Sequence, residues 1–304
     1  MRIALTGATG FVGGAVLETL LGKGIGVTAL ARRPPPEPAP PGVRFVAGNL
    51  ASSAALDRLV ADADAVIHVA GLVRTLDPAA FKAVNVDGTR ALAETATRHG
   101  VRRMVFVSSL AAREPQLSRY GASKRQAEEV VRSSGLHWTI VRPPAVYGPR
   151  DAEMLELFRL AARFGVVPVP PAGRASLIHV GDLARLLVAL VGAAPDPAMM
   201  EPDDGTAGGH THGALARMIG RAVGRRRVFA PAVPAVALRL AAGIDERVRG
   251  QAARLTGDRA RYMAHPDWVA DPAARPPRAL WQPRIGAEEG LAATARWYWD
   301  AGWL

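Results

Sequence analysis

The sequence contains no cysteine, which excludes disulfide bridges, thiolate metal ligands and cysteine nucleophiles. Lysine and tyrosine are also scarce, since only three of the 38 basic residues are lysine and the chain has four tyrosines. No uninterrupted apolar run reaches the roughly 18 residues that a membrane-spanning helix needs. The best candidate, near residues 228–244, is broken by Pro231, Pro234 and Arg239. We therefore expect no membrane span.

The composition is that of a globular protein. The chain has 304 residues, of which 49% are hydrophobic and 21% charged, so it is long enough for one large domain or two modest ones. These proportions argue against disorder, coiled coil and collagen-like repeats. The N-terminus enters an apolar run directly, without a signal-peptide pattern before Gly7. We expect a cytoplasmic protein.

The net charge is +11, and arginine supplies nearly all of the excess. A surface for nucleic acid or for an anionic membrane is one interpretation. The basic residues are spread along the chain, however, and only Arg225-Arg226-Arg227 forms a run of three. We favour an arginine-biased composition that suits a small phosphate-bearing ligand, and expect no nucleic-acid partner.

Short apolar runs alternate with amphipathic, helix-length stretches through the first 150 residues. This pattern predicts an α/β protein with a doubly wound, Rossmann-like parallel sheet that helices cover on both faces. Six prolines between Arg33 and Gly42 predict an extended loop in place of one crossover helix. The predicted strands are 2–6, 26–30, 43–46, 65–69, 104–107 and 138–141, and the predicted helices are near 11–22, 53–62, 79–98 and 120–133.

The pattern changes after residue 150. Residues 195–210 are rich in Pro, Asp and Gly, so we expect a dinucleotide-binding domain over 1–194 and a smaller substrate-binding subdomain over 195–304, with 151–175 contributing to the substrate side. Residues 152–164, 183–191 and 214–223 are predicted helices, and 176–180 a strand.

Two features of this later region have several interpretations. Ordinary helix packing best explains the apolar stretch 233–244, with a pocket for a hydrophobic substrate or contact with a membrane surface as alternatives. His210 and His212 have no carboxylate or histidine partners at ligand spacing, so we predict no metal site.

A glycine-rich turn joins the first predicted strand to the first helix. The spacing G-x-x-G-x-x-G permits a tight turn, lets backbone N–H groups approach a pyrophosphate and allows close packing of helix and strand. The helix N-terminus adds free N–H donors and the positive end of its dipole. We expect a dinucleotide to bind Gly7, Thr9, Gly10, Phe11, Val12 and Gly13.

The end of the second predicted strand indicates which dinucleotide binds. NAD-binding sheets usually place a carboxylate there to accept hydrogen bonds from the ribose 2′-OH. This chain has Arg32 and Arg33 at that point, with no carboxylate between Glu18 and Glu37. Two guanidinium groups suit a 2′-phosphate, so NADP(H) is the preferred cofactor and NAD(H) the alternative.

Tyr120 and Lys124 are spaced to share one face of the helix predicted after the fifth strand. A phenol with a pKa near ~10 is a poor acid–base catalyst at neutral pH, and a nearby ammonium group favours its ionised form. Two serines end the preceding strand. We expect Ser109 to orient a substrate oxygen beside Tyr120, and Ser108 to cap or bind backbone.

Together these motifs resemble the extended short-chain dehydrogenase/reductase superfamily, and within it the NAD-dependent epimerase/dehydratase branch. The resemblance covers the first 150 residues closely and the rest loosely. It rests on the glycine turn, Asn49-Leu50, Ala70-Gly71, Asn85-Val86-x-Gly88-Thr89, Ser108-Ser109, Tyr120-x-x-x-Lys124 and Arg142-Pro143-x-x-x-Tyr147-Gly148-Pro149.

The resemblance implies roles for individual residues. Tyr120 would be the proton donor or acceptor, Ser109 would orient the substrate oxygen, and Lys124 would hold the nicotinamide ribose and lower the pKa of Tyr120. Further cofactor contacts would come from Asn49, Leu50, Ala70, Gly71 and Pro143, and substrate contacts from Asn85 and Tyr147. For Asn85, a bond to backbone within its helix is an equal alternative.

Some residues depart from the family pattern. Leu110 and Ala111 stand where sugar-nucleotide dehydratases carry an Asp-Glu pair, so dehydration lacks its acid and base. Some relatives align the catalytic hydroxyl at position 110, which leaves Ser109 or a neighbour as the candidate. Ser109 and Tyr120 are eleven positions apart, without the longer insertion of many nucleotide-sugar enzymes.

The sequence therefore predicts an NADP(H)-dependent oxidoreductase that transfers hydride between nicotinamide and a small-molecule carbonyl or secondary alcohol. A nucleotide-sugar epimerase with bound NAD(H) is the first alternative, and a non-catalytic NADP(H)-binding accessory protein is the second. By analogy with the fold, a homodimer is expected.

Overall fold

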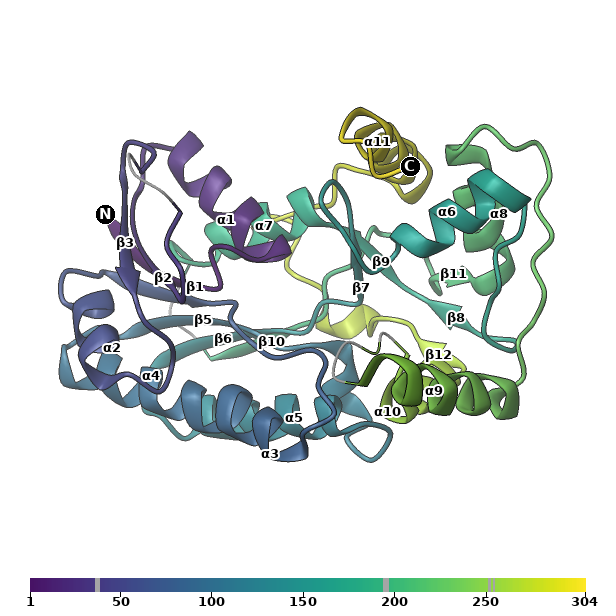
Figure 1. The fold of residues 1–304 in the computed structure, drawn as a ribbon. Helices are drawn as coiled ribbons and strands as arrows, with labels where there is room; N and C mark the ends of the chain where they lie inside the picture. Colours follow the sequence, from purple (N-terminus) through teal and green to yellow (C-terminus); the bar gives the residue numbers. More distant parts are fainter. Residues whose placement is uncertain (36–38, 194–196, 251–252, 254) are drawn as a thin grey trace. The chain divides into compact units, whose positions relative to one another are not determined.

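The computed structural model describes residues 1–35, 39–193, 197–250, 253 and 255–304 (Figure 1). The chain forms two compact units, each assembled from three separate stretches. The first unit comprises Met1–Arg142, Leu183–Met200 and Pro276–Trp281, and the second comprises Pro143–Asp182, Glu201–Arg275 and Gln282–Leu304. The boundary expected between residues 194 and 195 lies outside the described residues.

A seven-stranded sheet is the framework of the first unit. Its strand order is β10-β6-β5-β4-β1-β2-β3, and every pairing is parallel, which confirms the predicted doubly wound sheet. The edge strand β10 was not predicted from the sequence. The strands are β1 (Arg2–Thr6), β2 (Gly26–Ala31), β3 (Val43–Ala47), β4 (Ala65–His68), β5 (Arg103–Val107), β6 (His137–Val141) and β10 (Ala198–Met200).

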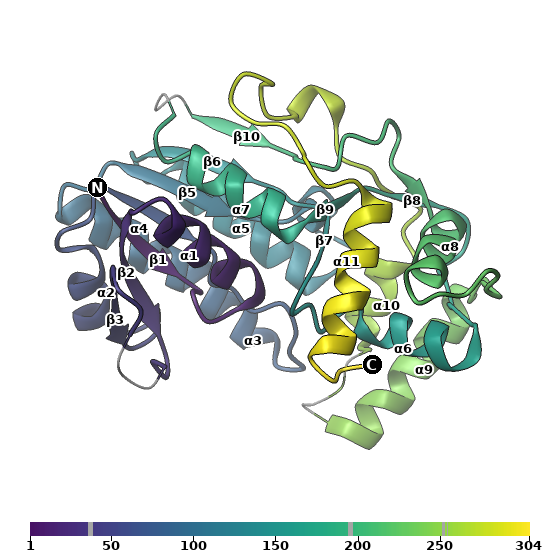
Figure 2. The same cartoon turned by 90° about the horizontal axis from the view of Figure 1, so that it is seen from above.

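Helices cover both faces of this sheet (Figures 1 and 2). On one face lie α1 (Phe11–Gly22) and α7 (Val180–Ala189), and on the other lie α2 (Ser53–Val60), α4 (Gly88–Arg98) and α5 (Arg119–Arg132). Fully buried aliphatic side chains of α2, α4, β5 and β6 form the core beneath the second face, among them Leu56, Leu59, Leu92, Met104 and Ile140. The strand order reverses around β1 and β4, and in such sheets ligands bind where the strands end at that point.

The helix predicted over 79–98 consists of three consecutive segments. It begins with α3 (Pro78–Phe81), continues as the π-helical segment η1 (Lys82–Asp87) and ends with α4. A π-helical turn changes the direction of the side chains that follow it and is frequent at functional sites. Asn85 lies in this segment.

The second unit has its own core of helices and short strands. Parallel strands β7 (Ala145–Tyr147) and β9 (Leu177–His179) form one sheet, and β11 (His210–Thr211), β8 (Arg174–Ala175) and β12 (Asp267–Trp268) form another. Aromatic and aliphatic side chains pack between α6 (Leu155–Phe164), α8 (His212–Ala222) and α11 (Ala287–Asp300), among them Phe158, Ile219, Leu291 and Tyr298.

Two further helices of the second unit, α9 (Ala235–Arg249) and α10 (Gly257–Met263), pack against each other in a smaller cluster around Leu238, Ala242 and Ala260. In Figure 1 they lie on the side of this unit opposite to α6 and α8. Among the described residues, no helix combines the length and the apolar character needed to cross a bilayer.

Candidate active site

The glycine turn has the geometry expected of a phosphate-binding loop. Gly7 follows β1 with φ +77°, and a Cβ there would lie 2.8 Å from the backbone nitrogen of Ala70. A Cβ on Gly13 would lie 2.0 Å from the carbonyl oxygen of Gly7, so only glycine permits this contact between strand and helix. Gly10 precedes α1, and no side chain of the described chain caps that helix. Its first N–H groups can therefore bind a phosphate, and the turn fits a dinucleotide.

The other residues predicted in this turn lie at the same end of α1. Phe11 and Val12 begin the helix and are half-buried, whereas Thr9 is exposed. Arg32 and Arg33 directly follow β2 and are exposed. Because β1 and β2 are parallel neighbours, the arginines and the glycine turn follow the same ends of the sheet strands.

The two residues after β3 have different surroundings. Asn49 is exposed, and its Oδ1 accepts a hydrogen bond from the backbone nitrogen of Ala51 at 2.9 Å. Leu50 is buried against Gly88, where a Cβ would lie only 2.8 Å from the Cβ of Leu50. Their contact with the adenine stays a prediction.

A buried histidine that the sequence analysis missed connects the glycine turn to the neighbouring loop. His68 Nδ1 lies 2.6 Å from Thr6 Oγ1, and its Nε2 lies 2.9 Å from Thr89 Oγ1. Thr89 donates to the carbonyl oxygen of Asn85, so it accepts from Nε2–H, while Thr6 donates to Nδ1 and accepts from the backbone N–H of Ala70. Burial lowers the pKa of His68 to about 3, with a smaller contribution from the Lys124 charge, so the ring stays neutral.

Asn85 holds the loop that follows β4. Its Oδ1 accepts from the backbone nitrogen of Leu72 at 2.6 Å, and its Nδ2 donates to the Leu72 carbonyl oxygen and to Ser123 Oγ, both at 2.9 Å. The bond to backbone thus reaches a separate loop rather than the helix of Asn85 itself. The substrate contact expected of Asn85 stays a prediction, since both amide hydrogens have protein partners.

Tyr120, Lys124 and Ser109 meet at the ends of β5 and α5. Ser118 Oγ accepts from the Gly121 backbone nitrogen at 2.9 Å and so caps α5, which carries Tyr120 and Lys124 one turn apart. Ser109 caps the 3-10 helix η2 (Leu110–Arg113), and its side chain hydrogen-bonds to that of Tyr120. The structure thus brings together the three residues expected to be catalytic.

The pKa of Tyr120 differs from the sequence-based expectation. Burial raises the pKa of the phenol above 10.0, and the hydrogen bond with Ser109 offsets this only in part. The ammonium of Lys124 instead donates to the Val107 carbonyl oxygen at 2.9 Å and lies 5.0 Å from the centre of the Phe106 ring. Burial lowers the pKa of Lys124 to about 8, while the charge of Glu128 acts in the opposite direction.

Gly71 leaves room for this ammonium group. A Cβ at Gly71 would lie 3.0 Å from Lys124 Nζ and 3.3 Å from Asn85 Oδ1. The predicted cofactor residues Ala70 and Gly71 therefore lie between the glycine turn and the Tyr120–Lys124 pair, as a nucleotide that reaches both would require.

A buried ion pair joins α5 to the residue that follows β6. The Glu128 carboxylate accepts hydrogen bonds from Arg142 Nε and Nη2, both at 2.7 Å, and from Ser108 Oγ at 2.6 Å. Ser108 thus binds a side chain, whereas backbone or capping bonds were expected. Glu128 was missed, although its position one helical turn after Lys124, on the same face, was a usable signal.

Pro143 and Tyr147 belong to the second unit. Pro143 is buried, and Tyr147 has no exposed surface. The Tyr147 ring packs edge-on against His179 at 5.4 Å between centres, and its hydroxyl donates to the Gly286 carbonyl oxygen at 3.4 Å. The structure gives Tyr147 a packing role, while the substrate contact of Tyr147 and the cofactor contact of Pro143 stay predictions.

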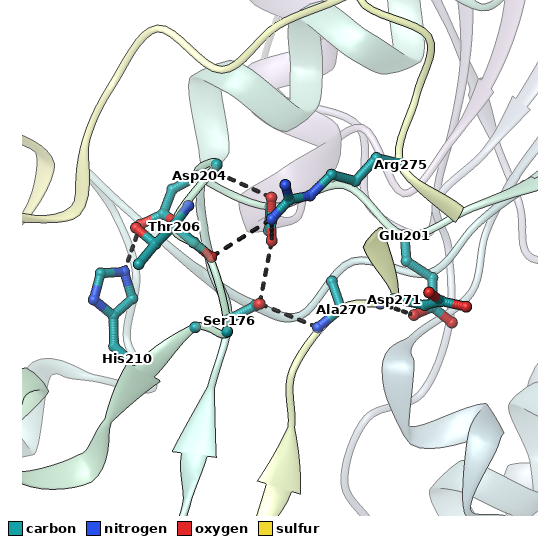
Figure 3. A network of polar contacts seen from close by, with 12 residues as sticks. Ser176, Glu201, Asp204, Thr206, His210, Ala270, Asp271 and Arg275 are labelled. Carbon is teal, nitrogen blue, oxygen red and sulfur yellow. Dashed lines mark hydrogen bonds and ion pairs between the residues drawn. The ribbon is translucent and has the colours of Figure 1, made fainter. Parts of the chain in front are cut away.

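Figure 3 shows a polar cluster within the second unit that holds its loops together. Arg275 Nη2 donates to Asp203 Oδ2 at 2.8 Å, and the backbone nitrogen of Ala270 donates to Ser176 Oγ at 3.1 Å. His210 Nε2 lies 2.7 Å from Asp204 Oδ2. Burial alone would raise the pKa of Asp204, but its hydrogen bonds with His210 and Thr206 lower it overall.

The two histidines considered as metal ligands have other partners. His210 binds Asp204, and His212 Nδ1 lies 3.0 Å from the Pro171 carbonyl oxygen. Across the described part of the chain, no group of three or more acidic or histidine side chains is arranged to hold a metal ion.

Comparison with known proteins gives relatives that cover different shares of the chain. Ceramide reductase from Caulobacter vibrioides is 39% identical over 308 residues, which cover 99% of this chain and 96% of that protein. UDP-glucose 4-epimerase from Vibrio cholerae is 27% identical over 62% of this chain and 66% of its own length.

Solved structures show the same fold at low identity. MoeE5 in complex with UDP-glucose and NAD matches with a TM-score of 0.76 and 22% identity, covering 99% of each chain. UDP-glucose 4-epimerase from Thermus thermophilus, in complex with NAD, has a TM-score of 0.72 and 22% identity over 99% of this chain and all of its own. A family model described as NAD(P)H-binding matches residues 7–191. The chain belongs to this NAD(P)H-binding family, in the epimerase/dehydratase branch of the extended short-chain dehydrogenases/reductases, and is an oxidoreductase or epimerase of that type.

Proposed function

We propose that the protein is an NADP(H)-dependent reductase of a ceramide-type lipid that carries a ketone. The observation that carries this proposal is the 39% identity with ceramide reductase over 99% of the chain. The cluster of Ser109, Tyr120 and Lys124 supports it, because carbonyl reduction needs one proton donor and one group that orients the oxygen.

Each of the three clustered residues has its own role in the proposed reaction. The glycine turn and Lys124 would hold a reduced nicotinamide dinucleotide, which would supply the hydride for the carbonyl carbon. Tyr120 donates its proton to the carbonyl oxygen, which becomes the hydroxyl of a secondary alcohol, and Ser109 orients that oxygen by hydrogen bonding. Lys124 binds the nicotinamide ribose. The raised pKa of Tyr120 means that the phenol is protonated at neutral pH, so it carries the proton that reduction of the carbonyl consumes.

We infer NADP(H) as the cofactor from the two residues that follow β2. Arg32 and Arg33 are exposed there and have the charge and geometry to bind a 2′-phosphate. We therefore expect the double variant Arg32→Ala/Arg33→Ala to weaken NADPH binding by more than about 100-fold and to change NADH binding less than threefold, because each of the two charge-assisted contacts contributes about 1.5–3 kcal/mol. Equal losses for both nucleotides in a fluorescence titration would refute the assignment.

The reaction is tested by NADPH consumption with a ketone-bearing ceramide dispersed in detergent. We expect Tyr120→Phe to lower kcat about 10²–10⁴-fold while it retains NADPH binding, because it removes only the proton donor. Tyr262→Phe is the matched control, since Tyr262 lies in the second unit and packs its ring on Trp268. Unchanged turnover of Tyr120→Phe would refute the proposed role.

The second candidate function is nucleotide-sugar epimerisation with bound NAD(H). The 27% identity with UDP-glucose 4-epimerase favours it. Mass spectrometry of the nucleotide that accompanies the purified protein separates the candidates. Tightly held NAD(H), with isomerised UDP-sugar and no net redox change, would select the epimerase, whereas NADPH binding without turnover of ceramide, carbonyl or UDP-sugar substrates would indicate the non-catalytic accessory protein.

A further inference from the structure

Helix α9 of the second unit carries an exposed apolar stripe. Four of the nine large hydrophobic side chains that the described residues leave exposed lie on this helix, and each is between 58% and 76% exposed. They are Val236, Leu240, Ile244 and Val248. Their spacing of four residues places them along one side of the helix. Ordinary helix packing, the favoured interpretation of residues 233–244 from sequence, accounts for Val233, Leu238 and Ala242, which pack in one cluster with Ala260 of α10.

The charged side chains of α9 also differ in exposure according to their sign. Arg239 and Arg247 are exposed, whereas Arg249 pairs with Asp245, with its Nε 3.3 Å from Asp245 Oδ1. The two acidic residues of the helix are half-buried and hold the α9–α10 connection, because Asp245 Oδ2 accepts from the backbone nitrogen of Leu255 and Glu246 Oε1 accepts from that of Gly257, both at 2.8 Å. The exposed side of α9 therefore combines aliphatic and cationic side chains and presents neither acid.

We propose that this side of α9 docks on the surface of an anionic lipid bilayer, with the helix in the plane of that surface. Aliphatic side chains at regular helical spacing would enter the boundary of headgroups and acyl chains, and arginine guanidinium groups would bind lipid phosphates. The exposed Arg239 and Arg247 complement the negative charge of lipid phosphates, and this charge complementarity favours an anionic bilayer as the occupant. The excess of basic residues in the whole chain adds long-range attraction.

This docking goes beyond the proposed reaction and does not depend on it, because vesicle binding requires no turnover. It gives the enzyme a means of meeting a substrate that resides in a membrane. If the reduction proposed above fails its test, the vesicle experiment still decides the role of α9.

The test is co-flotation of the full chain with vesicles of phosphatidylglycerol and phosphatidylcholine, compared with vesicles of phosphatidylcholine alone. We expect binding to the anionic vesicles that weakens at high salt. Leu240→Ser/Ile244→Ser should lower the partition coefficient by more than tenfold, since both side chains leave the apolar layer. The matched control is Phe164→Ser/Phe229→Ser, which removes two exposed apolar side chains of the same unit outside α9 and should change binding less than twofold.

A second pair of variants separates local docking from general attraction of a basic protein. Arg239→Gln/Arg247→Gln should weaken binding about fivefold for each charge removed. Arg226→Gln/Arg227→Gln removes two exposed charges outside α9 and should have a much smaller effect. Equal losses in the two pairs, or no vesicle binding by the unaltered protein, would overturn the proposal. A dimer in light scattering that Leu240→Ser/Ile244→Ser converts to monomers, without vesicle binding, would assign the stripe to a second copy of the chain and also overturn it.

Discussion

Replacing Arg142 by methionine tests the buried ion pair beneath the helix that carries Tyr120. Methionine has no charge, so among the described residues the fully buried Glu128 carboxylate would keep the Ser108 hydroxyl as its close donor, with the Arg132 guanidinium at 4.0 Å. Removal of one partner of a buried ion pair costs about 3–5 kcal/mol. For a folded unit of about 150–250 residues, each kcal/mol lowers Tm by about 2–4 °C. We therefore expect Arg142→Met to lower Tm by about 6–20 °C.

Glu128→Gln supplies the matched comparison, because its effect should change sign between two backgrounds. In the unaltered protein it removes the charge that lies 2.7 Å from the buried Arg142 guanidinium and should lower the free energy of unfolding by about 2–4 kcal/mol. In Arg142→Met it removes an unpaired charge and keeps an acceptor for Ser108, so it should raise that free energy by about 1–2 kcal/mol. Urea unfolding of nucleotide-free protein measures both. A loss below about 1 kcal/mol for Arg142→Met, or the same sign for Glu128→Gln in both backgrounds, would refute the reasoning.

Three further changes test the glycine turn and the buried titrating groups. Gly7→Ala should abolish NADPH binding in a fluorescence titration and lower the free energy of unfolding by about 1–3 kcal/mol, because φ of Gly7 is +77° and the added Cβ would lie 2.8 Å from the backbone nitrogen of Ala70. The control variant Gly22→Ala should bind NADPH normally, because its added Cβ has no atom within 4 Å. Folding lowers the pKa of Lys124 from 10.5 to about 8, so between these pH values the unfolded chain binds more protons than the folded protein. From pH 8 to 10.5 the free energy of unfolding of the unaltered protein should therefore rise by up to about 3 kcal/mol relative to that of Lys124→Met. Folding lowers the pKa of His68 from 6.5 to about 3, so the free energy of unfolding should decrease as the pH falls below 6.5, by up to about 5 kcal/mol. In urea titrations at each pH, His68→Phe should not show this decrease.

The sequence predicted what depends on local backbone geometry. The glycine spacing predicts the tight turn after β1, and the four-residue interval predicts that Tyr120 and Lys124 share one face of α5, because both follow from the conformation of a few neighbouring residues. The parallel sheet followed from apolar strands that alternate with helices.

Features that depend on tertiary packing were missed. The Thr6–His68 bond exists because β1 and β4 pair in a register that places these two residues side by side. The Arg142–Glu128 pair joins the end of β6 to α5. The direction of the Tyr120 pKa shift depends on how much of the phenol is buried, and spacing carries no information about that.

Short elements were the other source of error. Strand β10 has three residues, which is too few for an alternating pattern to show, and it forms because the Arg142 backbone nitrogen donates to the Met200 carbonyl oxygen beside β6.

Because each compact unit is assembled from three stretches of chain, neither can be excised as one continuous fragment. A protein truncated after β9 would lose the edge strand β10 along with the residues that form the rest of the second unit. Chimeras that exchange the second unit between relatives must therefore graft several separate segments at once. Natural variation faces the same constraint and is expected to proceed by point substitutions and loop changes rather than by exchange of whole cassettes.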